Sequence, residues 1–281
     1  MIVAEEFARQ SRDAVLSLRY EMLNGRSTLV QRSHYGPLLV QKPFYPEGDE
    51  VCQSIIVHPP GGIVAGDRLR IDVTVGADAH ALITTPGATK WYRSEGAWAE
   101  QQIALKVASG ASLEWLPQEA IVFNSARARQ SNFVELTEGA RYLGWDILVL
   151  GRMASHESFA AGSYQQAWHV TRNGRPLWLE RGRIDGGSRL IDSSAGLAGY
   201  SVVATLIAVG DVPSAALVAA LRAIAVGANA HAAVTAMPEV LSVRYLGHRV
   251  EDAKYFLQSV WCALRPHYFR RVVQTPRIWS T

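Results

Sequence analysis

The sequence is poor in cysteine, in clustered charge and in long apolar runs. Its two cysteines, Cys52 and Cys262, lie far apart without CxxC spacing, which excludes a disulfide framework and indicates reduced thiols. No apolar run is long enough to span a bilayer. The acidic residues Glu5, Glu6 and Asp13 stand where a signal peptide would carry its apolar core. We therefore expect a cytoplasmic protein with no membrane partner.

Charge is also sparse, which narrows the classes of function. Only 19% of the 281 residues are charged, the net charge is +3, and lysines and arginines are scattered. This distribution argues against a nucleic-acid partner. The eight histidines form no HxH or HxxxH pair, so we expect no closed metal site and no tightly bound cofactor. No Ser-His-Asp order, HExxH motif or paired-carboxylate signature indicates an enzyme.

Short runs with a period of two residues fill the first two thirds of the chain. Apolar and polar residues alternate over 69–75 and 103–107, for example, as is typical of strands separated by turns. Gly-Ala pairs begin at residues 76, 110 and 139, at intervals of 34 and 29 residues. Such intervals favour stacked supersecondary units, although Gly-Ala is also an ordinary turn pair in a β-sandwich.

The final third changes character. Residues 201–209 and 240–246 are strand-like, and residues 213–226 are helical in pattern. A last helix begins near Glu251 and Asp252, and its apolar stripe predicts docking on the protein's own core, with a partner-binding face as the alternative. The stripe consists of Ala253, Phe256, Leu257, Val260, Trp261 and Leu264. We expect one domain over residues 1–281, with a β-rich part (14–200) and an α/β tail (201–281).

The segment from His58 to Asp67 contains three glycines and ends in an acid. Gly61 and Gly66 have the spacing of a phosphate-binding loop, but Asp67 stands where that loop requires lysine. Nucleotide binding is therefore not expected. An acid in such a turn either caps local amides or contributes an oxygen ligand to a divalent cation.

Further charged residues lie in or near strand-like runs. Lys90 is expected to pair with Glu114 or Asp67. Glu114 and Glu180 stand beside tryptophans and, on alternation alone, point to solvent.

Three segments together resemble a known family. They are residues 58–67, 84–94 and 113–118, and Gly151-Arg152 follows them. Their order and spacing resemble the UreD (UreH) family of urease accessory proteins, over a region from about Gly25 to Trp279. Two residues depart from the usual pattern: Ala65 replaces a Gly, and His156 stands where a Gly commonly precedes Glu157. The second departure affects the local loop geometry, near the ion pair that we expect between Arg152 and Glu157, structural or facing a partner.

The resemblance implies a mainly β fold with a two-layered, superhelical, solenoid-like arrangement of strands and about two helices near the C-terminus. It implies a non-enzymatic urease-maturation chaperone, which docks homologues of UreF and of the GTPase UreG on apo-urease and assists nickel incorporation. Two alternatives stay open: a β-solenoid hydrolase or isomerase with acids in a groove, and a scaffold that never touches metal.

The family is also proposed to enclose a water-filled passage between its layers. Asp67 and Glu180 would then be transient oxygen contacts for nickel, and Thr89 and Lys90 would line the passage. Glu114 is assigned either to this lining or to the structure. Any nickel contact is expected to be weak and exchangeable, because tight binding would oppose delivery.

Overall fold

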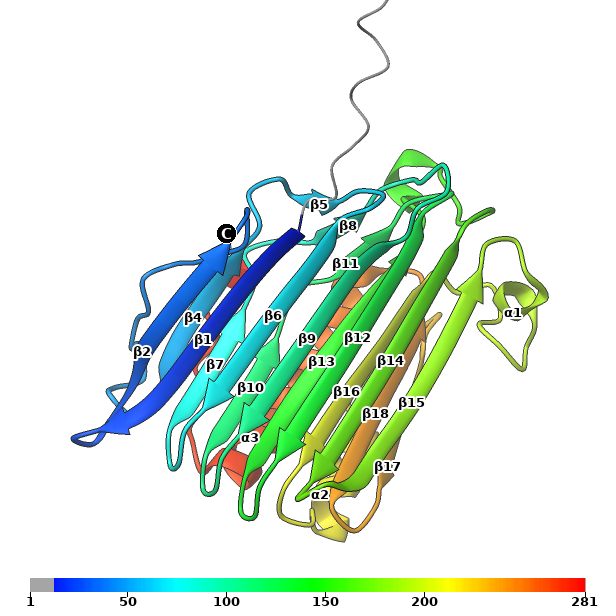
Figure 1. The fold of residues 1–281 in the computed structure, drawn as a ribbon. Coiled ribbons are helices and arrows are strands. Elements are labelled where there is room, and N and C mark those ends of the chain that lie inside the picture. Colours follow the sequence, from blue (N-terminus) through cyan, green and yellow to red (C-terminus); the bar gives the residue numbers. More distant parts are fainter. Residues whose placement is uncertain (1–12, 281) are drawn as a thin grey trace, which may run out of the picture.

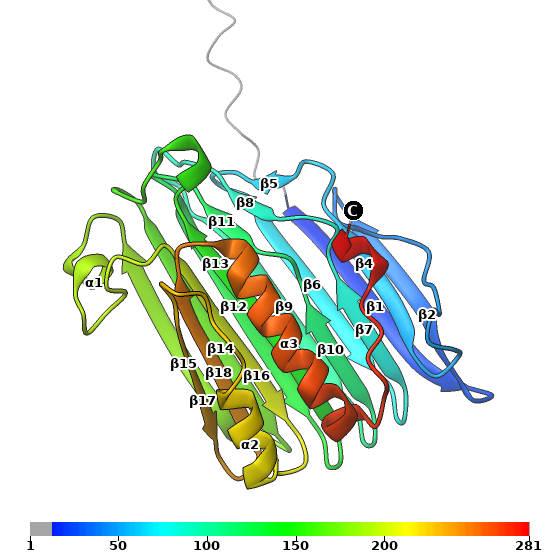
Figure 2. The ribbon, with the colours of Figure 1, turned by 180° about the vertical axis from the view of Figure 1, so that it is seen from behind.

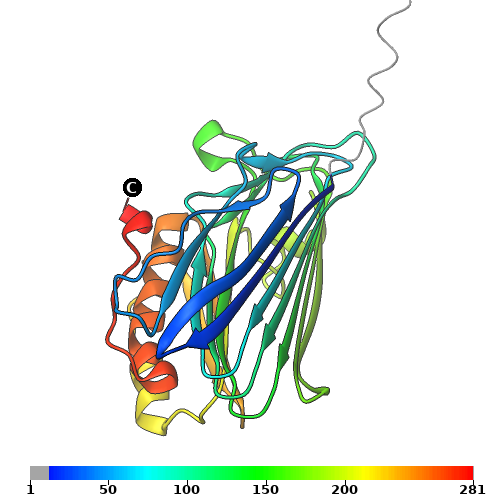
Figure 3. The ribbon, with the colours of Figure 1, turned by 60° about the vertical axis from the view of Figure 1, so that its left-hand side comes forward.

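A computed structural model of the chain describes residues 13–280, so Glu5 and Glu6 lie outside the described residues. Two β-sheets face each other, and the long C-terminal helix lies on one side of the pair (Figures 1 and 3). The predicted mainly β, two-layered, solenoid-like arrangement is confirmed.

The first sheet contains, in spatial order, β15 (Arg175–Asp185), β14 (Ser163–Arg172), β12 (Arg127–Leu136), β9 (Ala99–Val107), β6 (Arg68–Val75), β1 (Asp13–Leu23) and β2 (Arg26–Tyr35). The second sheet contains, in spatial order, β17 (His231–Ala236), β18 (Val240–Gly247), β16 (Val202–Val209), β13 (Arg141–Leu150), β10 (Ser112–Leu116), β7 (His80–Thr84), β4 (Cys52–Val57) and β3 (Leu39–Val40). Three short strands are attached to this sheet: β5 (Gly62–Ile63), β8 (Thr89–Trp91) and β11 (Ala120–Val122).

The chain winds through both sheets in successive coils. β6 leads to β7 and β8, β9 leads to β10 and β11, and β12 leads to β13. The coils stack in parallel and in register, so that Ile71, Ile103 and Asn132 are neighbours across the first sheet. Because side chains alternate along a strand, each such row lies entirely on one face. The inward rows are mostly apolar and form the core between the sheets.

The turns from the first sheet to the second repeat one conformation. Each has four residues, and the third residue is left-handed: Asp78, Gly110 and Gly139 have φ of 59°, 70° and 71°. A Cβ on Gly110 would overlap the Asp78 carboxylate. The prediction that Gly76-Ala77 is the first of the repeated pairs is wrong by two residues. Asp78 takes the place of the glycine because aspartate tolerates this conformation.

α2 (Ala215–Arg222) and α3 (Val250–Phe269) cover the outer face of the second sheet, as Figure 2 shows, whereas α1 (Arg189–Asp192) lies beside β15. Besides the two expected helices there are one short α-helix, α1 (Arg189–Asp192), and two 3₁₀ turns, η1 (Met153–Ser155) and η2 (Arg277–Ser280). The helix predicted over residues 213–226 is the shorter α2 (Ala215–Arg222). It begins after Ser214, whose hydroxyl accepts the Leu217 N–H at 3.2 Å as an N-cap.

The last helix, α3 (Val250–Phe269), carries the predicted apolar stripe. All six stripe residues are buried and belong to a second core, between α3 and the outer face of the second sheet. The prediction that this stripe docks on the protein's own core is therefore confirmed.

A buried ion pair fixes α3 to the coils. Glu114 of β10 and Arg265 of α3 have no exposed side-chain surface, and Arg265 Nε donates to Glu114 at 3.1 Å. Trp261 Nε1 also donates to Glu114 at 2.6 Å, and His80 Nε2 lies 2.8 Å from the same carboxylate. Burial raises the pKa of Glu114, but His80 and Arg265 outweigh burial, so the pKa lies below its usual range. The expectation that Glu114 points to solvent is wrong, because its face of β10 is covered by α3.

We predict that Glu114→Gln lowers the free energy of unfolding by about 3 kcal/mol, because Arg265 would keep a buried charge without its main counterion. Urea denaturation at pH 7 measures this loss. Because the pKa of Glu114 is lowered by folding, its contribution is present above the unfolded pKa of about 4.3 and is lost as the pH falls below it. Glu251→Gln is the matched control, since Glu251 pairs with Arg249 in solvent. Equal effects of the two variants would contradict the prediction.

Candidate functional site

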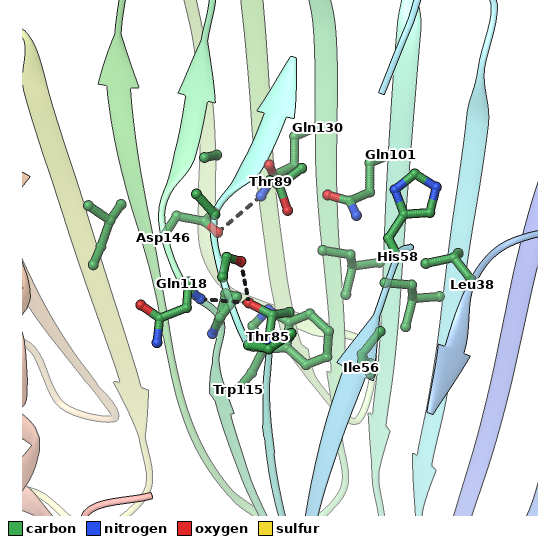
Figure 4. A pocket seen from close by; sticks show the side chains of 18 of the residues that line it. Leu38, Ile56, His58, Thr85, Thr89, Gln101, Trp115, Gln118, Gln130 and Asp146 are labelled. Atoms are coloured by element: carbon green, nitrogen blue, oxygen red, sulfur yellow. Dashed lines mark hydrogen bonds between the residues drawn. The ribbon is translucent and has the colours of Figure 1, made fainter. Parts of the chain in front are cut away.

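A cavity of about 190 Å³ lies between the two sheets, near the short strands β8 and β11. Its polar lining includes His58, Thr89, Gln101, Gln130 and Asp146 (Figure 4). The volume is sufficient for several water molecules, and the lining offers them hydrogen-bond partners.

The polar lining follows from the register of the first sheet. Gln101 of β9 pairs with Gln130 of β12, which pairs with Gln166 of β14. In-register neighbours share a face, so three side-chain amides form one row that faces the second sheet. The interior is therefore polar at this level, whereas most other inward rows are apolar.

Asp146 of β13 faces this row from the second sheet. Its Oδ1 accepts a hydrogen bond from Gln130 Nε2 at 3.0 Å. Its Oδ2 accepts from Asn132 Nδ2 at 2.9 Å, Gln166 Nε2 at 2.8 Å and Trp168 Nε1 at 2.8 Å. Burial raises the pKa of Asp146 to about 6, against the opposing effect of these four donors. One carboxylate thus connects the two sheets, and its proton is labile near neutral pH.

Asp67 lies in an adjoining pocket, also of about 190 Å³, whose lining includes Gly62, Tyr92 and His58. Its Oδ2 accepts the Val64 N–H at 3.0 Å and so caps the glycine-rich turn. Its Oδ1 has no hydrogen-bond donor among residues 13–280. Burial lowers the pKa of His58, and the charge of Asp67 opposes that shift. Asp67 therefore has one structural oxygen and one oxygen that is available to a ligand.

Glu180 lies elsewhere in the fold. It accepts hydrogen bonds from Trp178 Nε1 at 3.1 Å and from Arg244 Nη1 at 2.9 Å. Its strand, β15, is four strands from β6 in the first sheet, a separation of about 19 Å. The structure therefore does not bring Asp67 and Glu180 together, and Glu180 forms a cross-sheet ion pair with β18.

Thr89 and Lys90 are consecutive residues of β8, so their side chains point to opposite faces of the strand. Thr89 lines the cavity, and by alternation Lys90 points away from it. No carboxylate lies within ion-pair distance of Lys90 among residues 13–280. The prediction that Lys90 pairs with Glu114 or Asp67 is wrong, because Glu114 faces α3 on the outer side of the second sheet.

Arg152 and Glu157 form the expected ion pair. Arg152 Nη2 lies 2.6 Å from Glu157 Oε2, and Arg152 Nε donates to Oε1 at 3.1 Å. Glu157 also accepts the Asn124 N–H at 3.0 Å. Between the paired residues, His156 has a φ of 53°. This is the left-handed conformation that a glycine would favour, and here it is adopted with a Cβ.

The sequence interpretation missed Asp146, the row of glutamines and the place of His58. One signal for Asp146 was present, since it is the only acid in the otherwise apolar run 142–150. The glutamines gave no comparable signal, because their common face depends on the register between coils.

The comparisons with known proteins agree with this architecture. A family profile described as UreD urease accessory protein matches residues 12–280. The chain is 47% identical over 270 residues to "Urease accessory protein UreD" of Janthinobacterium sp. (strain Marseille), covering 95% of this chain and 91% of that protein. It is 46% identical over 271 residues to the protein of the same name from Dechloromonas aromatica (strain RCB), covering 95% and 94%.

These matches extend over the coils, the second core and α3. The fold and the comparisons define an accessory protein rather than an enzyme. The chain belongs to the UreD family of urease accessory proteins.

Two general properties hold for the described part of the chain. Within residues 13–280, no helix has the length and apolar character to cross a membrane. The same residues contain no group of three or more His, Cys, Asp or Glu side chains suited to hold a metal ion.

We predict that Asp146 makes the stability of the protein fall as the pH rises from about 4 to 7. The folded protein binds the Asp146 proton more tightly than the unfolded chain does, since the pKa rises from 3.8 to about 6 on folding. The stability associated with that proton is present below pH 4 and is lost as the pH rises through 6, by up to about 3 kcal/mol.

Denaturant unfolding of wild type and Asp146→Asn over this pH range measures the effect. The stability difference between the two proteins should change with pH in the variant's favour. Asp72→Asn, which changes an acid of the first sheet that pairs with Arg70, is the control and should show no such trend. A difference that stays constant with pH for Asp146→Asn would contradict the prediction.

Proposed function

We propose that this protein is the maturation scaffold that docks homologues of UreF and of the GTPase UreG on apo-urease, in the cytoplasm, and that nickel passes through its interior toward the urease active site. Family membership supports the first part. The observation that carries the second part is a pair of neighbouring cavities, each with one carboxylate in its lining: Asp146 in the cavity between the sheets and Asp67 in the adjoining pocket.

The donor set fits an ion that must move on. Asp67 Oδ1, the hydroxyl of Thr89, the amides of Gln101 and Gln130, and Asp146 offer oxygen atoms along the interior. Oxygen donors bind late first-row divalent ions more weakly than sulfur or several imidazoles do. Since the described residues form no closed site, nickel would keep water ligands and exchange one protein contact at a time.

Glu180 is proposed as a contact beyond Asp146. It is the register partner of Trp168, whose indole donates to Asp146. The buried Trp168 ring stands between the two acids along this row, and Arg244 already neutralises Glu180. An ion that reaches Glu180 must therefore displace part of these contacts. Among the proposed acids, Glu180 is therefore the one whose charge already has an ion-pair partner within the described residues.

A scaffold that never touches metal is the second candidate. Two observations favour it: Asp67 caps a turn with one oxygen, and Glu180 forms a cross-sheet ion pair. The nickel route and the metal-free scaffold predict different results for a variant that loses a carboxylate charge but keeps its hydrogen bonds. The route predicts lower urease activation, and the scaffold predicts no change.

We predict that Asp67→Asn and Asp146→Asn lower urease activation several-fold while the complex with the partner proteins still assembles. The side-chain amide introduced by Asp67→Asn retains an oxygen that can accept the Val64 N–H, so the turn survives and only the charge is lost. Asp67→Ala also removes the cap, at a cost of about 1 kcal/mol. Glu180→Gln should have a smaller effect than Asp146→Asn.

The measurements are pull-down yield, thermal midpoint and urease activity on the same preparations. Glu135→Gln serves as the control, because Glu135 pairs with Lys106 at the surface and lines neither of the two cavities. Activity that declines only in proportion to complex yield in every variant would reject the route and leave the scaffold.

A further inference from the structure

We propose that His58 is a nickel-binding residue, whose imidazole transfers the ion between the Asp67 pocket and the central cavity. The inference rests on the proposed nickel route. It adds one nitrogen donor, the His58 imidazole, to the oxygen donors that the route already includes. It concerns a side chain that the spacing of the histidines in the sequence did not single out.

The position of His58 is the first argument. Of the described residues that line the two cavities, His58 alone is common to both. On one side its pocket contains Asp67. On the other side its ring lies near Gln101 in the central cavity (Figure 4). An ion that leaves Asp67 for the cavity therefore passes the imidazole.

The ring is also available for coordination. Neither ring nitrogen of His58 has a hydrogen-bond partner among residues 13–280, whereas His80, for example, is occupied by Glu114. The His58 side chain is half-buried and lines both cavities. An imidazole without a partner among these residues, in the lining of both cavities, is placed to accept a ligand.

The backbone holds the ring at this junction. His58 directly follows β4, and its carbonyl accepts the Gly61 N–H at 2.8 Å in a tight turn. Pro59 and Pro60 lie inside that turn and fix two of its φ angles. Gly61 closes it with a φ of 72°, which a residue with a side chain adopts only with strain. The imidazole is therefore presented from a rigid support.

The chemistry matches transfer rather than storage. Ni²⁺ lies high in the Irving–Williams order and prefers imidazole nitrogen to water or amide oxygen. One imidazole with one carboxylate gives a contact stronger than those of the surrounding oxygens. It is still weaker than a closed site, which the described residues do not form. His58 would thus draw the hydrated ion inward and release it again.

The direct test is binding of Ni²⁺ alone to the purified complex of this protein with its partners. With ¹⁵N-histidine labelling of this chain only, paramagnetic Ni²⁺ should broaden the His58 side-chain resonance at lower concentration than those of the other histidines. The variant His58→Gln assigns that resonance and keeps a polar side chain. His169→Gln is the matched control, because His169 packs on Phe133 at the first sheet.

The second test is urease activation over a nickel titration. His58→Gln should reduce activation several-fold at limiting nickel, with unchanged complex yield, and high nickel should largely restore it. His169→Gln should behave as wild type. A structural defect in His58→Gln would instead reduce urease activation by the same factor at every nickel concentration, and high nickel would not restore it. This result would overturn the proposal.

The outcomes separate this inference from the route itself. If Asp67→Asn and Asp146→Asn impair activation but His58→Gln neither impairs it nor alters Ni²⁺ broadening, His58 is not a ligand and the route survives. If none of the three variants impairs activation with the complex intact, the route fails and the His58 proposal fails with it.

Discussion

The in-register, parallel stacking of the coils is the constraint on which the rest of this structure depends. It repeats each side-chain position at a fixed level, so a residue type that recurs from coil to coil forms a row across the interior. Most rows are apolar and hold the sheets together. One row consists of Gln101, Gln130 and Gln166, and it makes a polar layer that no single coil could form. Asp146 faces that row and accepts four hydrogen bonds across the two sheets.

A second core stabilises the outer face of the second sheet. α3 buries an apolar stripe on the second sheet and places Arg265 against Glu114. Glu114 and Asp146 differ in their counterions. Glu114 faces a guanidinium and remains charged, whereas Asp146 has only neutral donors and a pKa of about 6. The surroundings of Glu114 therefore favour its ionised form, whereas those of Asp146 favour uptake of a proton as the pH falls through about 6.

The sequence predicted the parts of the fold that rest on local pattern. The alternation over residues 69–75 and the stripe on α3 each reflect burial on one face, and both were confirmed. The parts that depend on register between distant residues were not predictable in this way. The pairing of Lys90 was wrong because the sequence does not reveal that Glu114 faces outward, and the first turn was misplaced because Asp78 substitutes for a glycine. The glutamine row required the coil register itself.

The proposed route differs from a metal site in the spacing of its donors. A closed site gathers three or four ligands around one point, and the affinity grows with each of them. In this structure, Asp67, His58 and Asp146 occur singly, at successive positions along two adjoining cavities. At each of these residues an ion would bind one strong protein donor, and its remaining ligands would be water molecules or amide oxygens. On the proposed route an ion would therefore meet no closed site among the described residues, and a partner with a complete ligand set would bind it more tightly.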